Sequence, residues 1–145
     1  MKTKRKVGDE SEKRGAKKVG GKKVKGSGCL WYNRGDYETD RFVYQNKFTS
    51  KDFYVLTISD LEKAKKDSIS KNKDFIFSID IQGDFYYIFE RCIVNDKVES
   101  SFKLNDRMEV TKQVKLTKDI IQKNWLINDK YILISEHEFL NGVIK

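Results

Sequence analysis

The chain has 145 residues, with 30 Lys and Arg, 22 Asp and Glu, one His, two Cys and no Pro. This length fits one domain with its own hydrophobic core, and two distant Cys with one His exclude a zinc finger and a disulfide scaffold. No run approaches about 18 apolar residues and no apolar segment follows the basic start, so we expect a soluble, cytoplasmic protein.

The positive charge is concentrated at the N-terminus. Residues 1–25 contain eleven basic and three acidic side chains, which accounts for the whole net charge of +8, and the rest of the chain is neutral overall. A basic segment on a neutral body is typical of a protein that binds nucleic acid, although a solubilising tail has the same composition. Because 24 of the 30 cations are Lys, we expect contacts to phosphates rather than sequence-specific reading of bases.

The pattern of apolar residues and turn formers predicts both helices and strands. We expect a disordered basic arm over residues 1–8, followed by a single domain over residues 9–145. The predicted helices are 9–19, 59–70, 117–124 and 136–140. The predicted strands are 41–48, 52–58, 75–81, 85–94, 108–116 and 130–135. This order favours an α/β or α+β fold, in which helices flank a mixed β-sheet.

Several local signals make these elements specific. Asp9 is the expected N-cap of the first helix, and Gly20-Gly21 is its expected end. The sequence Gln82-Gly83-Asp84 predicts a hairpin between two strongly apolar strands. Alternate side chains of the aromatic run Phe85–Phe89 are expected to face a core or a dimer interface rather than to stack on bases.

The single His and the two Cys favour structural roles. Catalysis by a Ser–His–Asp or Cys–His arrangement would depend on His137 alone, and we interpret His137 as a surface or helix-end residue. Cys29 and Cys92 are expected to be small buried side chains in a reducing compartment. Neither residue type therefore indicates a catalytic centre.

The residues most suited to catalysis lie around the first predicted strands. Asp36 enters one extended segment, and Gln45 and Lys47 lie on the next strand, where a spacing of two places both side chains on one face. Acidic oxygens can hold Mg²⁺ for phosphodiester hydrolysis, while a Lys positions water or neutralises developing charge. Glu12 on the first helix can add another carboxylate. Each residue also has an ordinary alternative as a turn, strand or helix-surface residue.

The region of about residues 9–70 contains an ordered series of motifs: Glu12, Gly20-Gly21, Gly26-Ser27-Gly28, Gly35-Asp36 and Gln45-Asn46-Lys47. This series resembles the PD-(D/E)xK nuclease superfamily, and most closely the Holliday junction resolvases of archaea and phages. The resemblance implies a restriction-endonuclease-like core. It also implies a homodimer that holds a four-way DNA junction and cuts two strands symmetrically, and the apolar surface of the aromatic strand favours the same homodimer.

The resemblance also implies roles for individual residues. The catalytic candidates are Glu12, Ser27, Asp36, Gln45 and Lys47. Among them Asp36, Gln45 and Glu12 would bind Mg²⁺ or Mn²⁺, Lys47 would be the catalytic lysine, and Ser27 would lie near the scissile phosphate. The candidates for DNA contact are Lys22, Lys23, Lys25, Trp31 and Arg34.

The chain departs from the family pattern at Gln45, where an acid is expected. An amide oxygen can bind Mg²⁺ but brings no charge, so we expect weaker metal binding unless Glu38 or Glu12 compensates. Glu10 competes with Glu12 for the role of the helix carboxylate.

Three functions remain open at this point. The first is a metal-dependent endonuclease that resolves four-way junctions. The second is a restriction- or repair-type nuclease that uses the same site on duplex or flapped DNA. The third is a non-catalytic DNA-binding module with a degenerate site, for which Gln45 is the main support.

Overall fold

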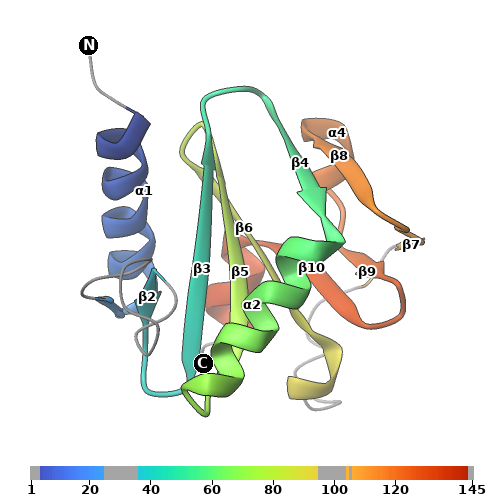
Figure 1. Cartoon of the computed structure of the whole chain (residues 1–145). Helices are drawn as coiled ribbons and strands as arrows, with labels where there is room; N and C mark the ends of the chain where they lie inside the picture. The colour runs from blue at the N-terminus through green and yellow to red at the C-terminus, as the bar shows by residue number, and fades with distance from the viewer. Residues whose placement is uncertain (1–3, 25–35, 95–103, 105, 144–145) are drawn as a thin grey trace.

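The computed structural model describes residues 4–24, 36–94, 104 and 106–143, and Figure 1 shows a mixed α+β arrangement around one large sheet. The helices are α1 (Lys4–Val19), α2 (Ile58–Ser70), α4 (Lys118–Ile121) and α5 (Glu136–Glu138), with short turns η1 (Arg91–Ile93) and η2 (Phe139–Val143). The large sheet contains, in spatial order, β1 (Lys22–Lys23), β2 (Tyr37–Glu38), β3 (Phe42–Thr49), β5 (Asp74–Ile81), β6 (Asp84–Glu90), β10 (Tyr131–Ser135), β9 (Trp125–Ile127) and β7 (Asp106–Met108). Strands β4 (Phe53–Thr57) and β8 (Gln113–Thr117) form a separate two-stranded ribbon.

Strands β2, β3, β5 and β6 are consecutive neighbours in the large sheet. Strand β2 pairs with β3 in the antiparallel sense. Strand β3 pairs with β5 in the parallel sense, because the chain returns through α2 to the starting end of β3 before β5 begins. Strands β5 and β6 form the predicted hairpin, and Gln82 (φ 54°) and Gly83 (φ 97°) at its turn both occupy the left-handed region. A two-residue turn of this kind matches the twist of the two strands.

Two hydrophobic cores cover opposite faces of this sheet. On one face α1 and the C-terminal turn pack on Tyr37, Tyr44 and Tyr87, all of which are fully buried. On the other face α2 and the β4–β8 ribbon pack on β5, where Leu56 and Leu116 of the ribbon are fully buried. Side chains along β5 and β10 alternate between the two cores, as the two-residue period of a strand requires.

Helix α1 begins five residues before its predicted start. The structure is helical from Lys4, so the expected disordered arm is wrong for residues 4–8, and Asp9 is an interior residue rather than an N-cap. Its predicted end is confirmed, because Gly20 adopts φ 68° and Gly21 N donates to Ala16 O over 2.8 Å.

The second half of the chain differs most from the prediction. The strand expected over 85–94 ends at Glu90, and the one expected over 108–116 is two strands, β7 and β8, that belong to different sheets. Strand β9 was not predicted. Cys92 is exposed, so its expected burial is wrong.

The aromatic strand β6 is covered within the chain. Phe85, Tyr87 and Phe89 are at most 2% exposed, and the ring of Tyr87 stacks on Phe139 at 4.0 Å. The expected core role of alternate aromatic residues is therefore confirmed. These three side chains therefore leave no exposed apolar surface of the kind that was expected to favour a dimer at this strand.

His137 is exposed on α5, as predicted for a surface or helix-end residue. Within the described residues, no helix has both the length and the apolar character needed to cross a membrane.

Candidate functional site

Asp36 is fixed against β3 at the entrance to β2. Its backbone N–H donates to Tyr44 O over 2.9 Å, which anchors the residue before β2 to β3. Its carboxylate oxygen Oδ2 accepts the backbone N–H of Asn46 at 2.7 Å and the side-chain Nε2 of Gln45 at 3.2 Å. The carboxylate is thus brought to the Gln45-Asn46-Lys47 segment, as the sequence predicted.

Gln45 and Lys47 point to one side of β3. Both side chains are half-buried, whereas the intervening Asn46 is buried on the opposite side. In the parallel register Gln45 lies beside Phe77, and Lys47 lies beside Ile79. The predicted same-face arrangement is therefore confirmed.

Glu12 reaches this site from α1. Ala16 and Val19 on the same helix are buried against the sheet. The pKa of Glu12 is raised to about 7, first because the side chain is partly buried and then because the Asp36 carboxylate lies close by, although Lys23 acts in the opposite direction. The Glu12 Oε2 and Lys23 Nζ atoms are 3.3 Å apart. Two carboxylates from distant parts of the sequence therefore share one site.

A network of buried polar side chains fixes the position of α1 against β3 and β5. The Ser11 hydroxyl donates to Asp80 Oδ2 at 2.6 Å, and Arg14 Nη2 donates to the same oxygen at 2.8 Å. Asn46 Nδ2 donates to the Ser11 hydroxyl at 2.9 Å, and Asn46 Oδ1 accepts from Ser78 at 2.8 Å. Satisfied networks in a low-dielectric core favour a single arrangement.

This network bears directly on the site because its members are neighbours of the site residues. Ser11 precedes Glu12, and Asn46 lies between Gln45 and Lys47. The sequence analysis assigned no role to the side chains of Ser11, Asn46 and Asp80. A signal was present, because Ser78 and Asp80 interrupt an otherwise apolar strand and buried polar groups need partners.

The donor set suits a hard divalent cation held weakly. Asp36 and Glu12 supply carboxylate oxygens and Gln45 an amide oxygen, and Mg²⁺ is commonly bound by one or two carboxylates together with substrate phosphates. In the described part of the chain, no three or more His, Cys, Asp or Glu side chains form a group that could hold a metal ion. Gln45, the third candidate ligand, directs its side-chain Nε2 toward Asp36 Oδ2 at 3.2 Å.

Glu38 does not supply the missing charge. Its carboxylate lies 2.6 Å from Lys71 Nζ and 3.5 Å from Lys73 Nζ. Burial acts to raise the pKa of Glu38, but the two lysines outweigh this effect and lower it. Of the two carboxylates proposed to compensate for Gln45, only Glu12 has a described interaction with Asp36.

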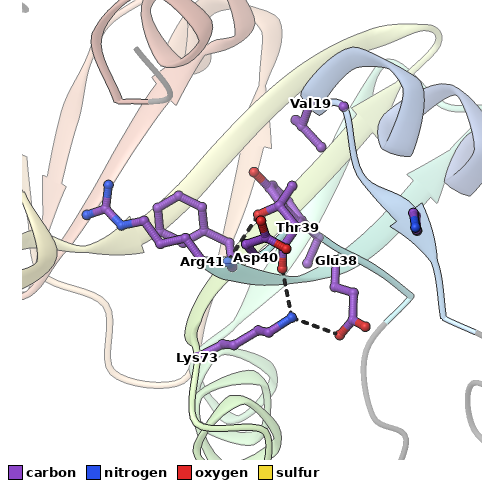
Figure 2. A pocket seen from close by; sticks show the side chains of 10 residues that line it. Val19, Glu38, Thr39, Asp40, Arg41 and Lys73 are labelled. Carbon is purple, nitrogen blue, oxygen red and sulfur yellow. Dashed lines mark hydrogen bonds and ion pairs between the residues drawn. The ribbon is translucent and has the colours of Figure 1, made fainter.

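A hollow of about 730 Å³ opens next to Glu38, and Figure 2 shows Glu38 and Thr39 converging on Lys73 there. The Lys73 ammonium donates to Thr39 O at 2.8 Å. The lining of this hollow includes Lys22 but none of Glu12, Asp36, Gln45 or Lys47. The hollow is therefore distinct from the candidate catalytic site.

The predicted DNA-contact residues have different outcomes. Lys23 pairs with Asp9 and Glu12 beside the site, and Lys22 is exposed. Ser27, Lys25, Trp31 and Arg34 lie outside the residues that the structure describes, as does Cys29.

Comparisons with protein-family models, curated proteins and solved structures give no match to this chain. The assignment of function consequently depends on the geometry of the site and on the motif resemblance.

Proposed function

We propose that the chain is a divalent-cation-dependent DNA endonuclease with a restriction-endonuclease-like core. The observation that carries the proposal is the meeting of Glu12, Asp36 and Gln45 at one site, with Lys47 on the same face of β3 as Gln45. Three separate elements contribute these residues, in the order that the PD-(D/E)xK resemblance implies.

The chemistry of the site fits phosphodiester hydrolysis. Asp36, Glu12 and the Gln45 amide oxygen would hold Mg²⁺ or Mn²⁺, which when bound polarises a phosphate and lowers the pKa of water. The Lys47 ammonium would neutralise negative charge that develops on the phosphate, and the Asn46 N–H keeps the Asp36 carboxylate oriented. The mutual effect of Glu12 and Asp36 also favours a cation, because two close carboxylates repel each other.

The proposed substrate is branched DNA, in particular the four-way junction, which would be bound by a homodimer. The motif resemblance supports this choice, and the excess of Lys supports recognition of the phosphate backbone rather than of base sequence. Duplex or flapped DNA is the alternative substrate for the same site.

A non-catalytic DNA-binding module is the second candidate function. The observation in its favour is that the Gln45 amide donates its Nε2 hydrogen bond to Asp36, where the family has a third acid. In that case DNA affinity would depend on salt but would not depend on Asp36 or Lys47.

A cleavage assay separates these functions. The chain, Asp36→Ala and Gln45→Glu are compared on a labelled four-way junction and on linear duplex, with Mg²⁺ and with EDTA. Cutting by the chain that Asp36→Ala abolishes supports the nuclease, and cutting only by Gln45→Glu identifies a scaffold disarmed at one position. Tight binding without cutting by any variant would establish the binding module.

A further inference from the structure

Five exposed lysines gather on the β4–β8 ribbon and on the segments that adjoin it. We call them the ribbon lysines, and they are Lys51, Lys112, Lys115, Lys118 and Lys123. Residues 111–123 contain four of them and one acid, Asp119. This segment is therefore strongly positive, although the chain beyond residue 25 is neutral overall.

The ribbon lysines have no acidic partners among the described residues. Elsewhere in the same part of the chain, basic side chains are neutralised, as in Lys18–Glu136 at 2.6 Å, Lys65–Glu90 at 2.9 Å and Lys71–Glu38 at 2.6 Å. Several lysines of the body are thus paired with acids, whereas all five ribbon lysines lack an acidic partner in the part of the chain that the structure describes. A local excess of one sign of charge attracts an oppositely charged partner.

Two of these lysines are held close together by one aromatic ring. The Lys51 and Lys115 ammonium nitrogens lie 5.4 Å and 4.2 Å from the centre of the Phe53 ring. Phe53 and Lys115 are on the outer face of the ribbon, and Leu56 and Leu116 face the core. Because the ring attracts both cations, it offsets part of their mutual repulsion and keeps two positive charges within about 10 Å of each other.

The ribbon lies on the same side of the sheet as Gln45 and Lys47. The ring of Tyr54 in β4 contacts Phe77, with ring centres 6.5 Å apart, and Phe77 is the register neighbour of Gln45. Lys51 follows Lys47 by four residues, so their Cα atoms are at most about 14 Å apart. That span is less than half of a duplex turn of about 34 Å.

We propose that the ribbon lysines bind the sugar-phosphate backbone of the DNA arm that enters the Asp36 site. The inference rests on the proposed function, and it names the surface that would fix the orientation of that arm. Lys is a compact point charge with no planar fork for bidentate contact with a base, so the ribbon contacts phosphates irrespective of sequence.

The test measures DNA binding separately from cleavage. Binding of a fluorescein-labelled duplex and of a four-way junction is measured by anisotropy in EDTA over a range of salt concentrations. The variant Lys51→Gln/Lys115→Gln keeps most of each side-chain stem and removes two charges. The matched control is Lys130→Gln, because Lys130 is also exposed and also lies over a ring, 5.2 Å from the centre of Tyr131, but is outside the ribbon.

The expected result is a lower salt dependence of binding by the double variant. The slope of log K against log salt should fall in magnitude by about 2, with a loss of roughly 10- to 60-fold in affinity at 0.1 M salt. The Lys130→Gln control should keep the slope of the original chain. Melting curves confirm that all variants are folded.

Three outcomes would overturn the proposal. If the chain binds and cuts DNA but the double variant keeps its affinity and slope, the ribbon is not the contact surface and the nuclease proposal stands. If polyglutamate binds as tightly as DNA with the same dependence on Lys51 and Lys115, the partner is an acidic polypeptide. If the chain neither binds nor cuts any DNA, the proposed function fails together with the inference.

Discussion

Glu12→Gln should stabilise the cation-free protein at pH 8. In the folded state the pKa of Glu12 is raised from 4.5 to about 7 by burial and by Asp36. The stabilisation associated with its proton is present below pH 4.5 and is lost as the pH rises through about 7. The full shift corresponds to about 3.4 kcal/mol at 1.36 kcal/mol per pH unit. Because the side chain keeps 19% exposure and is screened by solvent, we expect a gain of about 1–2 kcal/mol.

Urea unfolding in EDTA at pH 8 and pH 5 tests this expectation. The advantage of Glu12→Gln should shrink several-fold at pH 5, where the folded protein already carries the proton. Glu62→Gln, at an exposed position of α2, is the matched control and should change stability by less than about 0.5 kcal/mol. If Glu12→Gln is less stable than the original chain at pH 8, then the ion pair with Lys23 outweighs the repulsion from Asp36, and the reasoning is wrong.

Three further predictions concern the fold and the site. A Cβ at Gly15 would lie 2.5 Å from Tyr37 Oη, so Gly15→Ala should lower the free energy of unfolding by about 1–3 kcal/mol. A Cβ at Gly8 would lie in open space, so Gly8→Ala should raise the free energy of unfolding by about 0.5–1 kcal/mol. Equal effects of the two substitutions in thermal melts would contradict the packing of α1. Asp80→Ala should lower the free energy of unfolding in urea by about 2–4 kcal/mol, because buried donors lose their acceptor. A decrease below about 1 kcal/mol would refute the structural role of the network. Gln45→Glu should raise Mn²⁺ affinity at least about tenfold in calorimetry, and an unchanged affinity would remove position 45 from the proposed ligand set.

Elements with strong local signals could be predicted from the sequence alone. Strands β3, β4, β5 and β10 and helix α2 lie within one or two residues of their predicted limits, because runs of aromatic and β-branched residues and the helical spacing of apolar residues act locally. The turn at Gln82-Gly83 and the helix end at Gly20 were predictable for the same reason, since each needs a residue that tolerates positive φ. The common face of Gln45 and Lys47 also follows directly from the period of a strand.

The contacts between distant segments could not be predicted from local sequence and became visible only in the folded chain. The weakly patterned residues after Glu90 include β8, which pairs with β4 from the first half of the chain, and β7, which skips β8 to pair with β9. These pairings depend on tertiary contacts rather than on local preference, whereas β9 pairs with the neighbouring strand β10. Glu38 pairs with Lys71 and Lys73 and is not available to Asp36. Glu12 is the carboxylate near Asp36, because the Ser11–Asp80–Asn46 network fixes the position of α1. Lysines that look alike in the sequence also have different electrostatic surroundings in the folded chain. Folding brings acids to some of them and gathers others, such as Lys51 and Lys115, around one aromatic ring.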